Sequence, residues 1–166
     1  DAVAAGSSDS RYTVTYNAPS SLGSSSNMRV NIVHGDLNLG NNESGGGLLV
    51  VTGDLTTQGN ISWDGLILAL GGYVHIGGGG NGGLNGSIYV ANIDTSGSDW
   101  VFRTEADGSR TGSTFYNNGG GNATYAFDCT QLTLVHDLLN EVTPAATAIW
   151  TMPECAGSGS SESSDY

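Results

Sequence analysis

The segment NIVHGDLNLGNNESGGGL (residues 31–48) is followed without a gap by LVVTGDLTTQGNISWDGL (residues 49–66), which repeats it at a spacing of 18 residues. Eight of the 18 positions are identical, including the triplet Gly-Asp-Leu at 35–37 and again at 53–55. The next segment, ILALGGYVHIGGGGNGGLNGS (residues 67–87), continues the pattern with three extra residues. A fixed period of about 20 residues is typical of a solenoid, in which each turn of the chain stacks on the previous one.

Identical residues one period apart are expected to lie above one another in such a stack. Each turn would contain short apolar strands separated by Gly, Asn and Asp corners, where glycine adopts left-handed backbone angles without steric cost. Asparagine side chains in one column can form a ladder of hydrogen bonds along the stack. The predicted stacking residues are Gly35, Asp36, Leu37, Asn42, Gly53, Asp54, Leu55, Asn60 and Asn81.

The sequence therefore predicts an all-β protein, a short parallel β-solenoid (β-helix) whose turns contain about 18–21 residues. Low-complexity sequence matching itself by chance is the alternative, but Leu, Asp and Asn repeat in register as well as Gly. Outside the repeat, we expect a projecting loop, an extra N-terminal strand and a C-terminal cap. The predicted divisions are an N-terminal arm at 1–29 with a strand at 11–16 and a Ser-rich linker, the solenoid at 30–129 with an excursion at 92–117, the cap at 130–155, and a Gly/Ser/acidic tail at 156–166.

The cap region allows two secondary structures. Leu132, Val135, Leu138, Leu139 and Val142 have helical spacing, which predicts a short helix, although the alternation of apolar residues at 132 and 134 also permits a strand. Residues 145–152 resemble a last strand leading to Cys155.

The two cysteines, Cys129 and Cys155, fit no metal-binding or haem-attachment pattern. A disulfide that ties the C-terminal segment to the body suits the low charge and the Ser, Thr and Asn richness of an exported protein. Closing that loop would stabilise the fold by roughly 3–4 kcal/mol in the chain-entropy model. The alternative is a pair of separate buried thiols.

Composition excludes several partners. The net charge is −12 and there is no lysine, so the chain lacks the cationic surface that nucleic acids or anionic membranes require. No apolar run approaches the roughly 20 residues needed to span a bilayer. The sequence begins at Asp1 rather than Met, which indicates a processed or excised product, and we expect a secreted protein located outside the cell or on its surface.

Four segments of the repeat carry a family resemblance: GLLVVTGDL (47–55), GNISWDGLIL (59–68), GGLNGSIYVA (82–91) and GGGN (119–122) through Cys129. Through these segments the sequence from about residue 30 to 129 resembles the C-terminal repeat domains of PilX-like type IV pilus-assembly proteins and related bacterial surface proteins. The resemblance implies an envelope or surface location, a role in or beside pilus-like appendages, and no catalytic residues to transfer. The hydrophobic N-terminal helix of a pilin-like subunit is absent from the sequence given.

The sequence offers few candidate catalytic or metal-binding residues. His34, His75 and His136 lack metal-ligand spacing. Carboxylates on β-helices can bind calcium or cleave polysaccharides, so we also considered whether one face of the stack is lined by Asp36, Asp54 and Asp64. A lyase would need a basic residue near these acids, and Arg103 and Arg110 lie in the excursion. We therefore expect no catalytic residues, no cofactor and no metal, with calcium as the less favoured alternative.

The open ends of a solenoid are unpaired sheet edges, which favour assembly with other subunits. The strand containing Tyr12, Val14 and Tyr16 is the candidate subunit contact, because it could pair with the exposed sheet edge of a neighbouring molecule. The predicted function is that of a structural subunit of, or decoration on, a pilus-like filament, with copies of itself or other pilus components as partners. The alternatives are an adhesin that binds glycans or surfaces, with Trp100 as a test residue, and, less favoured, a polysaccharide-active enzyme.

Overall fold

The computed structural model describes residues 8–142, except 41, 79–80, 119–121 and 123. Within this part of the chain almost all strand pairing is parallel, and the predicted parallel β-solenoid is confirmed. The elements are β1 (Tyr12–Thr15), β2 (Arg29–Val33), β3 (Leu37–Leu39), β4 (Glu43–Val51), β5 (Leu55–Thr57), β6 (Ile61–Ala69), β7 (Tyr73–Ile76), β8 (Gly83–Val90), β9 (Ile93–Asp94), β10 (Val101–Phe102), β11 (Thr114–Asn117), β12 (Thr124–Ala126) and α1 (Cys129–Val142).

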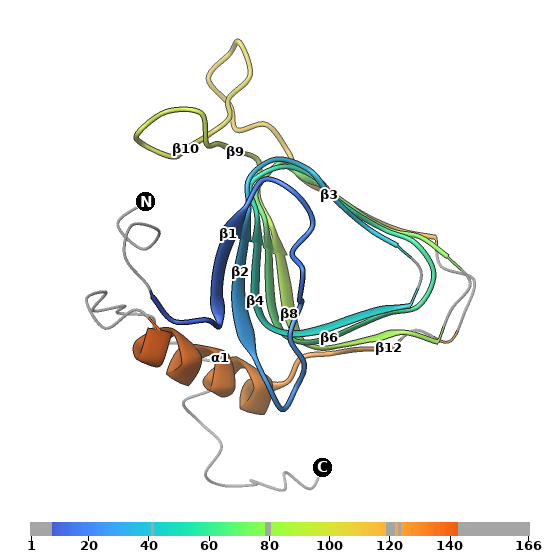
Figure 1. The fold of residues 1–166 in the computed structure, drawn as a ribbon. Coiled ribbons are helices and arrows are strands. Elements are labelled where there is room, and N and C mark those ends of the chain that lie inside the picture. The colour runs from blue at the N-terminus through green and yellow to red at the C-terminus, as the bar shows by residue number, and fades with distance from the viewer. Residues whose placement is uncertain (1–7, 41, 79–80, 119–121, 123, 143–166) are drawn as a thin grey trace, which may run out of the picture.

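Viewed end on, each turn of the coil has three sides (Figure 1). The first and second sides form one sheet in the order β1-β2-β4-β6-β8-β12, because the long strands β4, β6 and β8 run through both of them. The third side is a separate sheet in the order β11-β7-β5-β3. The first side comprises 43–46, 61–64, 83–85 and β12; the second side comprises β1, β2, 48–51, 66–69 and 87–90.

A column of glycines produces the bend between the first and second sides. Gly47, Gly65 and Gly86 occupy equivalent positions in β4, β6 and β8 and have φ angles of 110°, 132° and 136°. Residues with a Cβ rarely adopt such angles. The glycine that repeats in the sequence is therefore required where each long strand turns the corner.

The turns are stacked in the register that the repeat predicts. Leu48 of β4 pairs with Leu66 of β6, and the following residues pair in step up to Val51 and Ala69. On the third side one extra residue shifts the register, because Leu55 pairs with Val74 rather than with Tyr73. The remaining additional length lies in the Gly-rich corner that follows Ile76.

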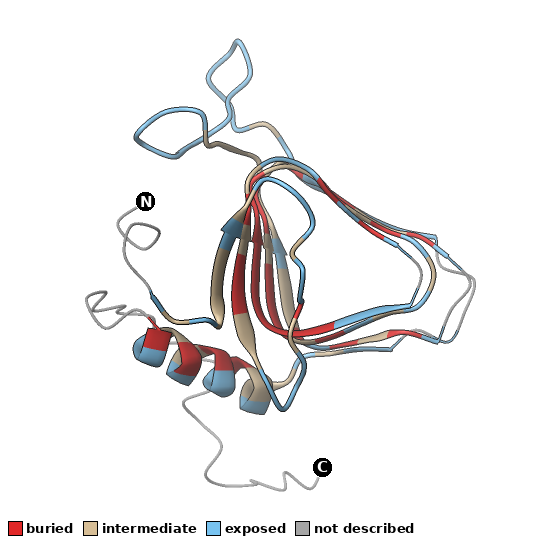
Figure 2. Ribbon diagram, in the orientation of Figure 1, coloured by how far each residue is buried: buried red, intermediate tan, exposed pale blue. Residues whose placement is uncertain are grey.

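Side chains alternate between the interior of the coil and its outer surface, as expected for strands. The interior is lined by columns of Leu, Ile and Val, and Trp63 is its largest fully buried side chain. On the second side the outward residues are apolar too, for example Val30, Leu48 and Leu66, and they form a separate buried cluster with α1. Figure 2 shows these buried strands and the buried stripe of α1 that faces them.

Asn31 interrupts the interior column that continues through Leu49 and Ile67. Its exposed fraction is 0%, and neither atom of its amide has a hydrogen-bond partner in the described part of the chain. Leaving a buried polar group unpaired costs about 1–3 kcal/mol. Asn31 is therefore a polar defect in an otherwise apolar column.

We expect Asn31→Leu to raise the free energy of unfolding by about 1–3 kcal/mol, because it removes the unpaired amide and adds apolar packing. Chemical denaturation of the two proteins measures the difference. The matched control is Asn38→Leu, because Asn38 is exposed on the outer face of the third side. A stability gain for N38L equal to that for N31L would contradict this explanation.

The helix α1 does not cover an end of the coil, as the predicted cap would; it packs along the outer surface of the second side. Asp128 caps its N-terminus, since its Oδ1 accepts hydrogen bonds from the backbone N–H groups of Thr130 (2.8 Å) and Gln131 (3.3 Å). The buried residues Leu132, Val135, Leu138 and Val142 then face β2, β4, β6 and β8.

The predicted N-terminal strand at 11–16 is present as β1, but within the described residues the predicted arm at 1–29 is not separate from the coil. Its strand, β1, pairs in parallel with β2 and forms the first strand of the second side. The linker that follows contains the buried residue Leu22, whose carbonyl accepts a hydrogen bond from Gly46 N–H (3.1 Å). Residues 16–28 therefore cross the N-terminal end of the coil (Figure 1).

The excursion begins after β8 and ends earlier than predicted, because residues 114–117 already form β11 in the third side. Within the excursion, β9 and β10 form a short antiparallel pair that projects from the coil (Figure 1). The predicted strand at 145–152, the tail at 156–166 and Cys155 lie outside the described residues. The disulfide between Cys129 and Cys155 therefore stays a prediction.

Candidate assembly surfaces at the two ends of the coil

The repeated Gly-Asp-Leu triplets form the corner between the second and third sides. The backbone N–H of Gly53 donates to the carbonyl of Gly35 (2.9 Å), and Leu37 is the register partner of Leu55. The backbone N–H of Asp54 donates to Oδ1 of Asp36 (2.9 Å). At this corner the aspartate side chain of one turn therefore bonds to the backbone of the next turn.

The three asparagines occupy the opposite corner, between the third and first sides. The side-chain amide of Asn60 donates to Oδ1 of Asn42 (3.0 Å), and the backbone N–H of Asn81 donates to Oδ1 of Asn60 (2.7 Å). The structure therefore brings these residues into one hydrogen-bonded column, although the upper step uses a backbone donor.

The three aspartates considered as a possible acidic face do not share one side. Asp36 and Asp54 lie in the same column at a corner, whereas Asp64 is on the first side and accepts a hydrogen bond from the Asn85 amide (2.8 Å). Among the described residues no cluster of three His, Cys, Asp or Glu side chains could hold a metal ion.

At the C-terminal end of the coil the interior columns finish on aromatic rings. Phe115 follows Leu55 and Val74 in the third side, and Tyr125 follows Leu84 in the first side. Both are large and partly open to solvent, with exposed fractions of 45% and 42%. Their rings meet edge to face with centroids 6.4 Å apart. Within the described part of the chain, the apolar interior is therefore exposed at this end.

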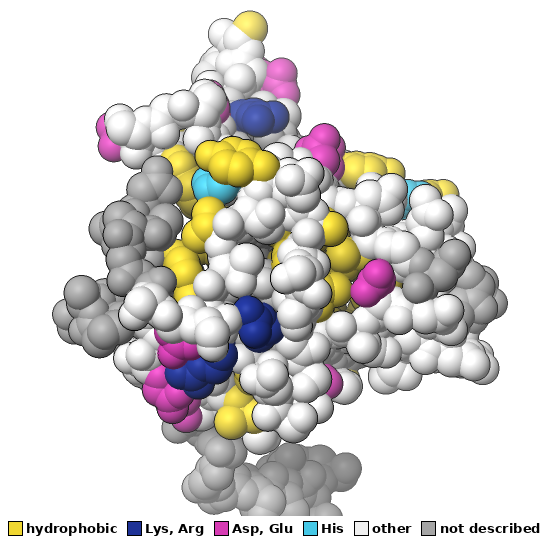
Figure 3. All heavy atoms as spheres, viewed as in Figure 1, with side chains coloured by type: hydrophobic (Ala, Val, Ile, Leu, Met, Phe, Trp, Pro, Cys, Tyr) yellow, Lys and Arg dark blue, Asp and Glu magenta, His cyan; other side chains and the backbone are white. Residues whose placement is uncertain are grey.

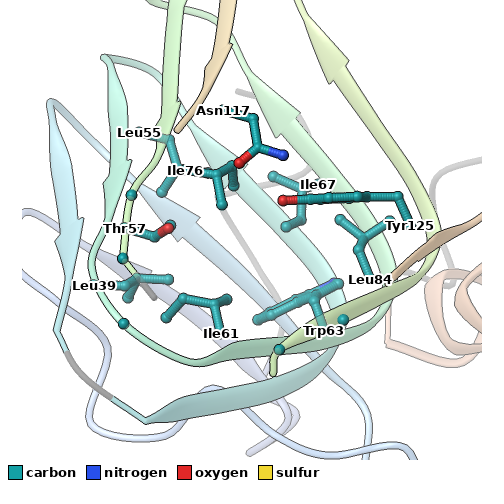
Figure 4. A pocket seen from close by; sticks show the side chains of 15 residues that line it. Leu39, Leu55, Thr57, Ile61, Trp63, Ile67, Ile76, Leu84, Asn117 and Tyr125 are labelled. Atoms are coloured by element: carbon teal, nitrogen blue, oxygen red, sulfur yellow. The ribbon is translucent and has the colours of Figure 1, made fainter. Parts of the chain in front are cut away.

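Next to the Tyr125 ring is a cavity of about 40 Å³ between the first and third sides (Figure 4). The side chains that point into it are mostly apolar, and Asn117 and Tyr125 come from the last turn. Thr57 also lines it, and its buried hydroxyl has no hydrogen-bond partner in the described structure. A cavity of this size has room for about two or three water molecules.

The same end has unpaired strand edges. In the second side, the half of β8 at 87–90 pairs with β6 on one edge, and no described strand pairs with its other edge. The last strand, β12, pairs with the first-side half of β8 only, from Gly83 to Asn85. At this end the six-stranded sheet therefore forms a step, because it extends to β12 on the first side and only to β8 on the second side.

The N-terminal end is different, because residues 16–28 cross it and Leu22 is buried against the interior. In the space-filling view of Figure 3, polar side chains and backbone atoms cover most of the visible face, and hydrophobic side chains form smaller patches. The candidate contact strand β1 is at the edge of the second side here. Tyr12 is partly buried and Val14 is exposed, while Tyr16 stacks on His34 with ring centroids 5.0 Å apart.

Arg11 connects this end to the helix. Its guanidinium forms ion pairs with Asp9 (2.8 Å) and with Glu141 in the last turn of α1 (2.7 Å). Hydrogen bonding from Arg11 lowers the pKa of Asp9 from 3.8 to about 2. The ion pairs of Asp9, Arg11 and Glu141 thus connect the start of β1 to the last turn of α1.

We expect the contribution of Asp9 to stability to be complete above about pH 4 and to disappear as the pH falls to about 2, because its carboxylate is then protonated in the folded state too. The melting temperature of Asp9→Asn should therefore be slightly below wild type at pH 6 and equal to it at pH 2. Salt should also reduce the difference, because the pair is partly exposed to solvent. D99N, in the excursion, is the control, and a difference between D9N and wild type that grows as the pH falls would contradict this assignment.

The projecting excursion exposes three consecutive apolar residues, Trp100, Val101 and Phe102. The guanidinium of Arg110 lies over the Phe102 ring, 4.1 Å from its centroid. A second group of rings lies on the outer face of the third side, where His75 is 5.2 Å from Tyr116 and hydrogen-bonds Asn118 (3.0 Å). These are surface features separate from the ends of the coil.

Sequence reasoning missed the open half of β8 and the aromatic residues that end the interior columns. A signal existed for the first of these, since Ile88 continues the column of Leu49 and Ile67 and the repeat provides no further residue beyond it. Phe115 gave no such signal, because it falls inside the segment predicted to project.

Comparisons with protein-family models, with curated proteins and with solved structures found no match to this chain. In the described part of the chain, no helix combines the length and the apolar character needed to cross a membrane.

Proposed function

We propose that this chain is an extracellular structural protein, a subunit of or a decoration on a pilus-like surface filament, and that subunits assemble by pairing of sheet edges. Its partners are copies of itself or other components of the filament. It acts without a cofactor and without catalysis. The pilus-like setting rests on the sequence resemblance, and the mode of assembly rests on the ends of the coil.

The observation behind the assembly mode is the C-terminal end of the coil, where interior columns finish on Phe115 and Tyr125 beside unpaired strand edges. Unpaired edges are templates for further strands, and exposed apolar surface favours association. Interactions of this kind add copies along the axis of the coil, which is the geometry of a filament.

Electron microscopy of the purified full chain tests this function. We expect fibres with a regular subunit repeat at high protein concentration, or regular binding along isolated pilus-like filaments. Discrete monomers that neither polymerise nor bind such filaments would overturn the proposal.

A second candidate is an adhesin that binds glycans, favoured by the exposed indole of Trp100 on the projecting excursion. Exposed aromatic rings can provide platforms on which sugar rings stack. A glycan array tests it: binding that is lost in Trp100→Ala and kept in Asp99→Asn would support this function. An array without any bound glycan would exclude it for the glycans tested.

A further inference from the structure

The open edge of β8 has defined hydrogen-bonding groups. The N–H of Ala91, directly after β8, donates to the carbonyl of Ala69. The odd-numbered residues in this half of β8 therefore direct their backbone N–H and carbonyl groups toward β6. In a parallel ladder the alternate residues point to the other edge. Ile88 and Val90 therefore direct their backbone groups toward the unpaired side, where the Val90 carbonyl accepts a hydrogen bond from the Ser113 hydroxyl (3.2 Å).

At the opposite end of the molecule, β1 has the complementary edge. Its pairing with β2 uses the carbonyls of Arg11 and Thr15, which accept hydrogen bonds from Val30 N–H and His34 N–H. The alternate residue, Val14, therefore directs its N–H and its carbonyl away from β2. Both edges belong to the second side and both strands run in the same direction.

We infer that β1 of a second copy of this chain pairs in parallel with residues 87–90 of β8 and fills the step at the C-terminal end of the sheet. The inference rests on the proposed function and specifies the joint between two subunits. The joint is head to tail, so each copy presents β1 to one neighbour and β8 to the other, and the association continues without closing.

The register of this joint follows from the columns already present in the second side. Tyr12 is paired with Val30, Val30 with Leu48, Leu48 with Leu66, and Leu66 with Ser87. Continuing the same columns places Thr13 of the second copy beside Ile88 and its Val14 beside Tyr89. Val14 N–H then donates to the Ile88 carbonyl, and Val90 N–H donates to the Val14 carbonyl.

The side chains at this joint are compatible. Val14 and Tyr89 point outward, have exposed fractions of 38% and 54%, and become neighbours on the outer face. Ile88, which is partly buried and packs against the interior, gains a neighbour on its open side. Two exposed apolar side chains are thus covered by one contact, which favours association.

The first side of the coil extends as far along the axis as the second side does. The second side of one subunit contains five strands, β1, β2, β4, β6 and β8. On the first side, the segment around Leu22 lies before β4 and bonds to it, so it takes the position next to β12 of the preceding copy.

Disulfide trapping between two separately purified variants, Val14→Cys and Tyr89→Cys, tests the joint. Outward residues on neighbouring strands are about 4.8 Å apart, within the range that a disulfide can bridge. After mixing and mild oxidation, we expect a dimer cross-linked between positions 14 and 89, identified by mass spectrometry. Its yield should be at least tenfold higher than that from V14C mixed with Thr56→Cys, because Thr56 lies on an inner strand of the third side.

A proline variant gives a second readout. In Val14→Pro the lost N–H faces away from β2, so the intrachain pairing is kept and the melting temperature should change little. Assembly should fall at least tenfold in V14P and be retained in Val14→Thr, which keeps the N–H.

Cross-links that form mainly between two Y89C chains would overturn the head-to-tail joint, because they indicate a tail-to-tail dimer. Fibres that persist in V14P would overturn the joint while leaving the filament function intact, and wild-type protein that never assembles would overturn both.

Discussion

Replacing Gly65 with alanine is expected to destabilise the coil by more than about 4 kcal/mol, a large part of the roughly 5–15 kcal/mol by which a folded domain is usually stable. Gly65 has a φ of 132°, an angle that residues with a side chain rarely adopt. A Cβ at this position would overlap the carbonyl oxygen of Gly47 in the preceding turn. Because that oxygen belongs to the backbone of a paired strand, no side-chain rotation can relieve the overlap.

The matched control for Gly65→Ala is Gly40→Ala. Gly40 is also a corner glycine, but a Cβ there meets no atom within 4 Å. Thermal unfolding followed by circular dichroism should show a melting temperature close to wild type for G40A and a strongly lowered melting temperature for G65A. Equal stability of the two variants would mean that the turns are not stacked as closely as the structure has them.

Truncating Trp63 to alanine is expected to cost about 3–5 kcal/mol, the range typical for removing a large aromatic side chain from a core. The exposed fraction of Trp63 is 2%, and its indole lies in the space above Gly45 of the preceding turn. Its N–H donates to the carbonyl of Gly47 (3.3 Å). The variant therefore loses apolar contacts, opens a cavity next to the existing one and leaves a buried carbonyl without this donor.

Trp100→Ala is the control for this truncation, because Trp100 is exposed on the projecting excursion. Denaturant unfolding of W100A should match wild type within about 0.5 kcal/mol, as is usual for surface substitutions. Trp63→Phe should fall between wild type and W63A, since it restores part of the lost volume. If W63A were as stable as W100A, Trp63 would not be the centre of the interior packing.

The part of the fold that could be predicted from the sequence is the part specified by the repeat. Gly35, Asp36 and Leu37 recur one turn later, and each position has a physical role in the stack: a corner, a hydrogen bond to the next backbone, and an interior side chain. Local sequence and long-range packing coincide in a solenoid, because every turn contacts the turns adjacent to it.

The segments outside the repeat were placed less well, because no recurring residue fixes their position. The side chains of the segment 11–16 alternate with the period of two that predicts a strand, but the segment lacks the Gly-Asp-Leu triplet. Nothing in it therefore specified that it joins the second side. The position of α1 had a signal that was not used. Residues 48–51 and 66–70 are apolar without alternation, which indicates strands buried on both faces and thus a covering element.

Helical reconstruction of the assembled wild-type protein by electron cryomicroscopy measures the central claim most directly. Five strands per subunit on the second side, at the spacing of about 4.8 Å between neighbouring strands, give an axial rise of about 24 Å per subunit. We predict this rise, with β1 of each copy continuing the sheet beyond β8 of its neighbour. A clearly larger rise, or a filament in which the coils lie side by side instead of end to end, would contradict the account.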